Sequence, residues 1–299
     1  MKPLSTWLSI TSLMLSSLTV AANPAFVPEQ PLLVPAWESE AVLEGPESVV
    51  YDAQQKLLFV SNVNGNPNDV DSNGYISTLS LDGQVINQHW LDGLNAPKGL
   101  ALVGSTLYVA DINELVVIDT KQKKIINRYK APKAKFLNDV AADSQGNIYV
   151  SGFLTNTIYR LADDKFEIWL DDAQLEQPNG LLVEGDNLIV GSWGVMTDGL
   201  ATEIAGHLKT INISNKKIQS LGDKTPAGNL DGVEADGQNN YFVTDWMQGK
   251  LLYITPKGKS TTLIALPQGS ADHTVLLEQN LVIIPMMLTG NLIAFEIKK

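Results

Sequence analysis

Short apolar runs separated by polar turns recur along the chain from Glu47 onward. Six segments share one order: a polar residue, an apolar run, a turn and a second apolar run. The turns are rich in Gly, Asn, Asp and Ser, which is typical of tight hairpins, and the runs are rich in Val, Leu, Ile, Tyr and Phe, which favour strands. The segments begin 51, 40, 41, 52 and 41 residues apart, at Glu47, Lys98, Asn138, Asn179, Asp231 and Asp272.

This repeat predicts an all-β fold. Further short apolar runs follow each hairpin, and no long segment shows helical periodicity. Four strands in roughly 40–50 residues, repeated six times, predict a six-bladed β-propeller with four-stranded blades around a central channel. A β-sandwich would not repeat such a unit six times, and a parallel β-helix would need shorter repeats. We expect a single domain over residues 23–299, in which a strand near residues 37–43 completes the last blade beside residues 291–297.

The first 22 residues have the pattern of an export signal. Lys2 supplies a positive end, residues 4–20 are mostly apolar or small, and Val20, Ala21 and Ala22 offer a cleavage site. An uncleaved anchor helix is the alternative, although the segment is short for a span. We therefore expect a periplasmic or secreted protein with no membrane span after signal removal.

Composition narrows the chemistry. The chain of 299 residues has 33 acidic and 21 basic residues, a net charge of −12, and no Cys. The missing Cys excludes disulfides, thiolate metal sites and Cys nucleophiles. The negative charge disfavours nucleic-acid binding and favours a hard cation. No serine-hydrolase elbow, HExxH helix or phosphate loop occurs in the sequence.

The six first residues of the repeat are expected to meet around the propeller axis. All six are polar, although their strand neighbours are apolar. The local alternative is that they cap strand ends in turns, as Asn-Gly and Asp-Gly often do. Together, Glu47, Asn138, Asn179 and Asp231 offer oxygen ligands with two negative charges, which suits Ca²⁺, with another divalent cation as the alternative. Lys98 is the one cation of the six, and we expect it to be a salt-bridged spacer.

These residues carry a resemblance to the regucalcin/gluconolactonase/luciferin-regenerating-enzyme family. The segment from Glu47 resembles the first-blade motif, and Asn138-Asp139, Asn179-Gly180 and Asp231-Gly232 match the motifs of blades three to five. The resemblance implies the same four metal ligands, calcium-dependent hydrolysis of lactones or related esters, and Asp231 as the catalytic base. One departure is Phe136, which stands where sugar-lactonase members have an Arg that holds substrate hydroxyls. We therefore expect less hydroxylated substrates.

Several assignments stay open at this stage. Asp272 and His273 are alternative catalytic residues. His273 directly follows Asp272, the first residue of the sixth repeat, and because neighbouring strand residues point to opposite faces it can equally point into the core. Residues 64–74 are interpreted as a long turn, with a weak cation site as the alternative. Trp193, Trp246 and Met287 end second strands and either pack between blades or wall a pocket, with residues 196–206 as a lid. The leading hypothesis is a monomeric calcium-dependent hydrolase of a lactone, ester or phosphoester; the alternative is a non-enzymatic propeller that binds a small molecule or partner protein.

Overall fold

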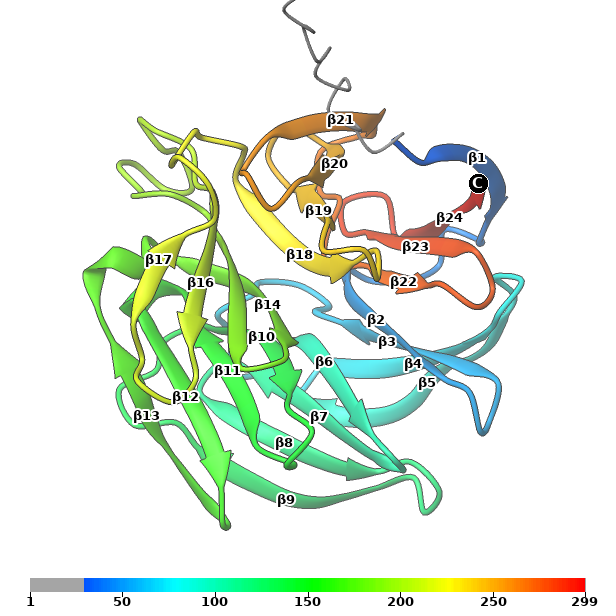
Figure 1. Ribbon diagram of the computed structural model, residues 1–299. Helices are drawn as coiled ribbons and strands as arrows, with labels where there is room; N and C mark the ends of the chain where they lie inside the picture. The colour runs from blue at the N-terminus through cyan, green and yellow to red at the C-terminus, as the bar shows by residue number, and fades with distance from the viewer. Residues whose placement is uncertain (1–29, 299) are drawn as a thin grey trace, which may run out of the picture.

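Six antiparallel sheets of four strands surround one axis, as Figure 1 shows. The computed structural model describes residues 30–298. The predicted six-bladed β-propeller is therefore confirmed. The predicted signal peptide at residues 1–22 lies outside the described residues.

The first three blades follow one another along the chain, each from its innermost to its outermost strand. Blade 1 contains β2 (Pro46–Asp52), β3 (Leu57–Asn62), β4 (Gly74–Ser80) and β5 (Val85–Leu94). Blade 2 contains β6 (Pro97–Val103), β7 (Thr106–Asp111), β8 (Glu114–Asp119) and β9 (Lys124–Lys130). Blade 3 contains β10 (Leu137–Ala142), β11 (Ile148–Gly152), β12 (Thr157–Ala162) and β13 (Lys165–Asp171), with a 3₁₀ turn at Phe153–Thr155.

The remaining blades continue the same order, except that the last one borrows its outer strand from the start of the chain. Blade 4 follows a 3₁₀ turn at Ala173–Leu175 and contains β14 (Pro178–Glu184), β15 (Asn187–Ser192), β16 (Leu208–Asn212) and β17 (Ile218–Ser220). Blade 5 contains β18 (Leu230–Ala235), β19 (Tyr241–Asp245), β20 (Lys250–Ile254) and β21 (Ser260–Ala265). Blade 6 contains β22 (Thr274–Leu276), β23 (Leu281–Met286), β24 (Asn291–Lys298) and β1 (Leu32–Glu38).

The outer strand β1 closes the ring by pairing with β24. Leu33 lies opposite Ile297, and Trp37 lies opposite Ala294. The predicted partner of this strand is correct, but the predicted bounds are wrong, because the strand ends at Glu38 instead of continuing to residue 43. The chain needs residues 39–45 to cross from the outer edge of blade 6 to the axis, where β2 begins.

The core lies between neighbouring blades. Inner strands are buried on both faces, so that consecutive residues such as Leu58, Phe59 and Val60 are all inaccessible to solvent. Outer strands such as β9 instead alternate between exposed and half-buried positions. This difference explains why the inner strands have unbroken apolar runs, which made the repeat visible in the sequence.

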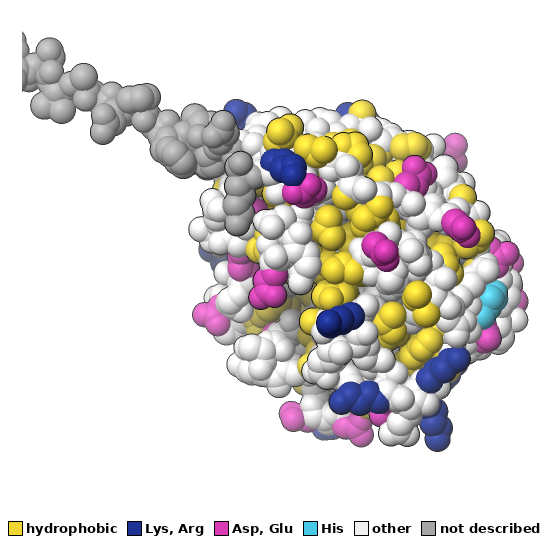
Figure 2. All heavy atoms as spheres, turned by 90° about the vertical axis from the view of Figure 1, so that its right-hand side faces the viewer, with side chains coloured by type: hydrophobic (Ala, Val, Ile, Leu, Met, Phe, Trp, Pro, Cys, Tyr) yellow, Lys and Arg dark blue, Asp and Glu magenta, His cyan; other side chains and the backbone are white. Residues whose placement is uncertain are grey.

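The outer surface is mixed in character. The face in Figure 2 shows hydrophobic side chains in a band, with acidic and basic side chains interspersed around it. Within residues 30–298, no helix has both the length and the apolar character needed to cross a bilayer.

Candidate active site on the propeller axis

Five of the six ring residues predicted from the repeat, those of blades 1 to 5, lie at a β-bulge of an innermost strand, whereas Asp272 of blade 6 lies just before β22. In blade 1, Pro46 pairs with Asn62 and Val49 with Val60, so three steps along β2 oppose two along β3. The same irregularity falls at the equivalent position of blades 2 to 5. A bulge bends its strand and redirects a side chain. The ring side chains are all buried, at most 8% exposed: Glu47, Lys98, Asn138, Asn179, Asp231 and Asp272.

Hydroxyl groups of the second strands satisfy the amides that these bulges free. The acceptors are Ser61 Oγ for the amide of Ser48 at 3.0 Å, Ser151 Oγ for Asp139 at 2.8 Å and Thr244 Oγ1 for Gly232 at 2.9 Å. A buried amide without a partner would cost about 1–3 kcal/mol. The Ser and Thr near the ends of these apolar strands are therefore part of the machinery that holds the ring.

The glycines that follow Asn179 and Asp231 are required by close approach of neighbouring strands, not by turns. A Cβ on Gly180 would lie 1.8 Å from the carbonyl oxygen of Asp231, and one on Gly232 would lie 2.6 Å from Asp272 Oδ1. Both glycines belong to strands, β14 and β18. The alternative interpretation of Asn-Gly and Asp-Gly as turn caps is therefore wrong here.

Three of the four predicted metal ligands have a buried oxygen with no hydrogen-bond partner. These atoms are Glu47 Oε2, Asn179 Oδ1 and Asp231 Oδ1, which come from blades 1, 4 and 5. Buried polar atoms are rarely left unpaired, because each one costs free energy. Unpaired oxygens at equivalent positions on one axis are suited to a hard cation.

The pKa values of the ring carboxyls show that these groups lie within electrostatic reach of one another. Burial raises the pKa of Glu47 well above its usual range, and the charges of Asp231 and Asp272 raise it further. Burial and the charge of Asp272 also raise the pKa of Asp231 well above its usual range. A cation bound between such carboxylates would relieve this repulsion.

The donor set fits calcium only with its amide oxygens included. Among residues 30–298, no three His, Asp or Glu side chains form a group that could hold a metal ion by themselves. A site at the ring therefore depends on the buried side chains of Asn138 and Asn179 as well as on Glu47 and Asp231. Calcium accepts such mixed carboxylate and amide coordination.

Lys98 does not act as the predicted salt-bridged spacer. Its Nζ donates to the carbonyl oxygens of Ala96 at 2.8 Å and Pro67 at 3.1 Å, and lies 4.3 Å from the centre of the Phe136 ring. Within the part of the chain that the structure describes, Lys98 forms no ion pair. Burial lowers the pKa of Lys98 to about 8, against the opposing charges of Glu47 and Asp111. The carbonyl of Pro67 ties the long turn of residues 64–74 to the ring, a contact that no residue-type pattern predicts.

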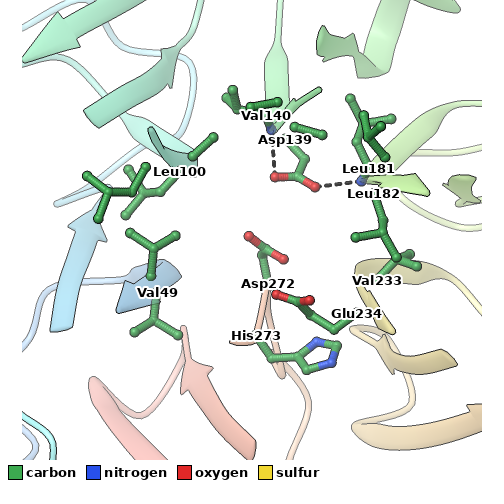
Figure 3. A pocket seen from close by; sticks show the side chains of 16 residues that line it. Val49, Leu100, Asp139, Val140, Leu181, Leu182, Val233, Glu234, Asp272 and His273 are labelled. Carbon is green, nitrogen blue, oxygen red and sulfur yellow. Dashed lines mark hydrogen bonds between the residues drawn. The ribbon is translucent and has the colours of Figure 1, made fainter. Parts of the chain in front are cut away.

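A cavity of about 240 Å³ occupies the channel next to the ring. Apolar side chains that follow the bulges, including Val49, Leu100 and Val233, line it. Figure 3 shows Asp272, Glu234 and His273 along one side of this cavity and Asp139 entering from the opposite side.

The two alternative catalytic residues have different environments. Asp272 Oδ2 accepts a hydrogen bond from Ser48 Oγ at 2.6 Å, and burial raises the pKa of Asp272 to about 7. His273 is 2% exposed, lines the cavity, and has no partner for either ring nitrogen. Burial lowers the pKa of His273 to about 3, so its ring is neutral at physiological pH.

Two carboxyl groups of the cavity were not among the predicted site residues. Asp139 accepts from the amides of Val140 and Leu181, both at 2.6 Å, and so joins blades 3 and 4. Burial and the charge of Asp272 raise the pKa of Glu234 to about 8. A signal for both was present in the sequence: each is a second polar residue of its innermost strand, Asp139 directly after Asn138 and Glu234 three residues after Asp231.

Comparisons with known proteins agree with this fold and add the family. The structure resembles a gluconolactonase from Xanthomonas campestris with a TM-score of 0.66 and 14% identity, over 90% of each chain. It also resembles a catalytically inactive virginiamycin B lyase from Staphylococcus aureus, with a TM-score of 0.57 and 12% identity, over 89% of this chain and 99% of that one. A comparison with curated protein sequences found no match. The family model described as the SMP-30/Gluconolactonase/LRE-like region matches residues 45–276, and the chain therefore belongs to this family.

Proposed function

We propose that the protein is a calcium-dependent hydrolase of a lactone, ester or phosphoester. The family suggests lactone hydrolysis on a small-molecule substrate. The observation that carries the proposal is the set of buried, unpartnered oxygens of Glu47, Asn179 and Asp231 on three different blades. With Asn138, these residues would hold the metal. Bound there, calcium would act as a Lewis acid on a substrate oxygen that becomes negative during attack by water.

In this proposal, Asp231 acts on the attacking water. One carboxylate oxygen of Asp231 accepts a proton from the water as the water oxygen bonds to the acyl or phosphoryl centre. The bond to the leaving oxygen then breaks, and Asp231 returns the proton to that oxygen, so a lactone yields a hydroxy acid. The burial of Asp231, at 4% exposed, keeps competing water away from this carboxylate.

Asp272 and His273 are the alternative bases. Asp272 already accepts a hydrogen bond from Ser48, which weakens it as a proton acceptor. His273 is buried beside the cavity, and its low pKa makes its ring a poor base. Both observations favour Asp231.

The test is a panel of γ- and δ-lactones, aryl esters and phosphotriesters, assayed with calcium and with a chelator. We expect turnover that the chelator removes and added calcium restores. Asp231→Asn, assayed at saturating calcium, should lower kcat at least 100-fold, whereas Asp186→Asn, an exposed hairpin residue, should retain full activity. Turnover of no substrate in the panel would contradict the hydrolase and favour the binding module. Full turnover by Asp231→Asn would show that Asp231 is not the catalytic base, and the base would then be Asp272 or His273.

We further propose export and a monomeric state. The support for export is the charge and apolar pattern of residues 1–22. Cell fractionation and the mass of the mature N-terminus test cleavage after Ala22, and light scattering tests the monomer. A protein retained in the cytoplasm with Met1 intact would contradict the export proposal.

A further inference from the structure

The residue directly after each second strand is apolar in all six blades. These residues form what we call the collar: Val63, Ile112, Phe153, Trp193, Trp246 and Met287. The second strands run antiparallel to the innermost strands, so the collar lies at the same end of the propeller as the ring. For example, the amide of Trp193 donates to the carbonyl oxygen of Gln177 at 2.9 Å, and Gln177 lies two residues before Asn179.

The collar is divided into an aliphatic half and an aromatic half. In blades 1 and 2, Val63 and Ile112 form one buried cluster with Ala96, against which Met287 of blade 6 packs. In blades 3 to 5 the collar residues are aromatic. Phe153 lies 5.5 Å from Trp193 between ring centres, and Trp193 lies 6.1 Å from Trp246.

Phe136 extends the aromatic half toward blade 2. Its ring centre lies 5.6 Å from that of Phe153 and 4.3 Å from Lys98 Nζ. Four rings therefore form a continuous chain across three blades. The middle rings, Phe153 and Trp193, are each 3% exposed, whereas the end rings, Phe136 and Trp246, are half-buried and reach solvent.

Two polar groups beside the aromatic half are engaged within the protein. Asn229 Nδ2 donates to the carbonyl of Trp193 at 2.9 Å, and Trp193 Nε1 donates to the carbonyl of Leu200 at 2.9 Å. These bonds hold the segment of residues 194–206 against Trp193. That segment exposes apolar side chains, Val195 at 57% and Ile204 at 66%. The Nδ2 group of Asn229 and the Nε1 group of Trp193 are therefore not free to hydrogen-bond with sugar hydroxyls.

We propose that the aromatic half of the collar binds an apolar acyl or aryl part of the substrate. The substrates would then be lactones or esters with an alkyl chain or an aromatic group, and not polyhydroxylated sugar lactones. This inference rests on the proposed hydrolase at the ring and names its substrate class. The half-buried rings of Phe136 and Trp246 are the specificity-determining residues, because they combine aromatic surface with access from solvent.

The experiment uses γ-lactones with alkyl chains of increasing length, compared with glucono-1,5-lactone. We expect kcat/KM to rise about two- to four-fold per added methylene until the chain outgrows the aromatic half. Trp246→Ala should flatten this dependence, and Trp246→Phe should restore most of it. Ile86→Ala, which removes an apolar side chain that is 58% exposed on the outer strand β5, is the matched control and should behave like the wild type.

A binding measurement separates this inference from the proposed hydrolase. Tryptophan fluorescence titrations with the same lactones should show affinity rising with chain length in the wild type and not in Trp246→Ala. Tight, length-dependent binding without turnover would contradict the proposed hydrolase and would leave the inference about the aromatic half in place. Turnover that favours glucono-1,5-lactone, or a length dependence unchanged in Trp246→Ala, would overturn the inference while leaving the hydrolase in place.

Discussion

The amide of Asp272 donates to the carbonyl of Glu47 at 2.9 Å, which joins the innermost strands of the last and first blades. Ser48 strengthens this junction: its Oγ donates to Asp272 at 2.6 Å and accepts from the amide of Leu100 at 3.2 Å. One Ser side chain thus links blades 6, 1 and 2 at the axis. The same junction holds the carboxyl groups of Glu47 and Asp272 within electrostatic reach, which raises the pKa of Glu47.

Removing the Ser48 hydroxyl should destabilise the ring closure. Ser48→Ala leaves the buried amide of Leu100 and one oxygen of Asp272 without this partner, so we expect a loss of about 1–3 kcal/mol in the free energy of unfolding. Urea unfolding measures the effect. Ser214→Ala, at an exposed turn, should change stability by less than about 0.5 kcal/mol. Equal stability of the two variants would contradict the role of Ser48.

Calcium affinity should depend on the two ring carboxylates. Glu47→Gln and Asp231→Asn each remove one of the two negative charges of the proposed ligand set, and we expect each to weaken calcium binding at least ten-fold. Titration calorimetry measures this change, with Asp186→Asn as the control for a lost surface charge. Unchanged affinity in both ring variants would disprove the assignment of the ligands.

Stability of the calcium-free protein should fall as the pH rises from about 6.5 to about 8. Burial raises the pKa of Glu234 to about 8 and that of Asp272 to about 7, so the folded protein keeps protons that the unfolded chain has already lost. The stability from these neutral carboxyls is complete below about pH 4, falls as the carboxyls of the unfolded chain ionise, and is lost in full once the pH passes about 8. His273, with a pKa of about 3, stays neutral, and Lys98, with a pKa of about 8, changes charge mainly above the window.

Thermal unfolding in a chelator should therefore show Tm falling by a few degrees across this range. Glu234→Gln should make the profile flatter, and Glu167→Gln, at an exposed site on β13, should leave it unchanged. A Tm that rises or stays constant over the window in the wild type would contradict the prediction.

Close approach at the axis makes Gly180 irreplaceable. In Gly180→Ala the new Cβ would meet the carbonyl oxygen of Asp231 at 1.8 Å, so β14 and β18 must move apart. We expect a loss of several kcal/mol and weaker calcium binding. Gly185→Ala, in the hairpin of the same blade, meets no atom within 4 Å but has a φ of +57°, and should cost only about 1 kcal/mol. Similar losses in both variants would show that strand spacing at the axis is not limiting.

The fold was predictable because every blade places the same requirements on its sequence. Inner strands buried on both faces need unbroken apolar runs, and each blade starts near the axis with a polar residue, so the pattern recurs six times. The bounds of β1 were not predictable to the residue, since its end depends on how many residues the chain needs to cross from β24 to β2.

The sequence predicts which residues lie at the site better than it predicts the hydrogen-bond partners of those residues. The spacing placed Glu47 and Asp231 at equivalent points of two blades, as the structure has them. It could not reveal that Lys98 donates to main-chain carbonyls, because every residue has a carbonyl and no residue type marks which one lies nearby. Glu234 does not stand out in the sequence, because it lies three residues after the repeat position that marks Asp231 in the same strand.

The pairing of β1 with β24 has a consequence for the order of folding. The Asn291 side chain donates to the carboxylate of Glu38 at 2.6 Å across 253 residues of sequence, and Leu32 pairs with Lys298. The last blade therefore stays incomplete, with an open strand edge, until β24 has been synthesised. The strand β1 is made first and has no partner until β24 follows it, so closure of the propeller depends on contacts of very large sequence separation, which form slowly.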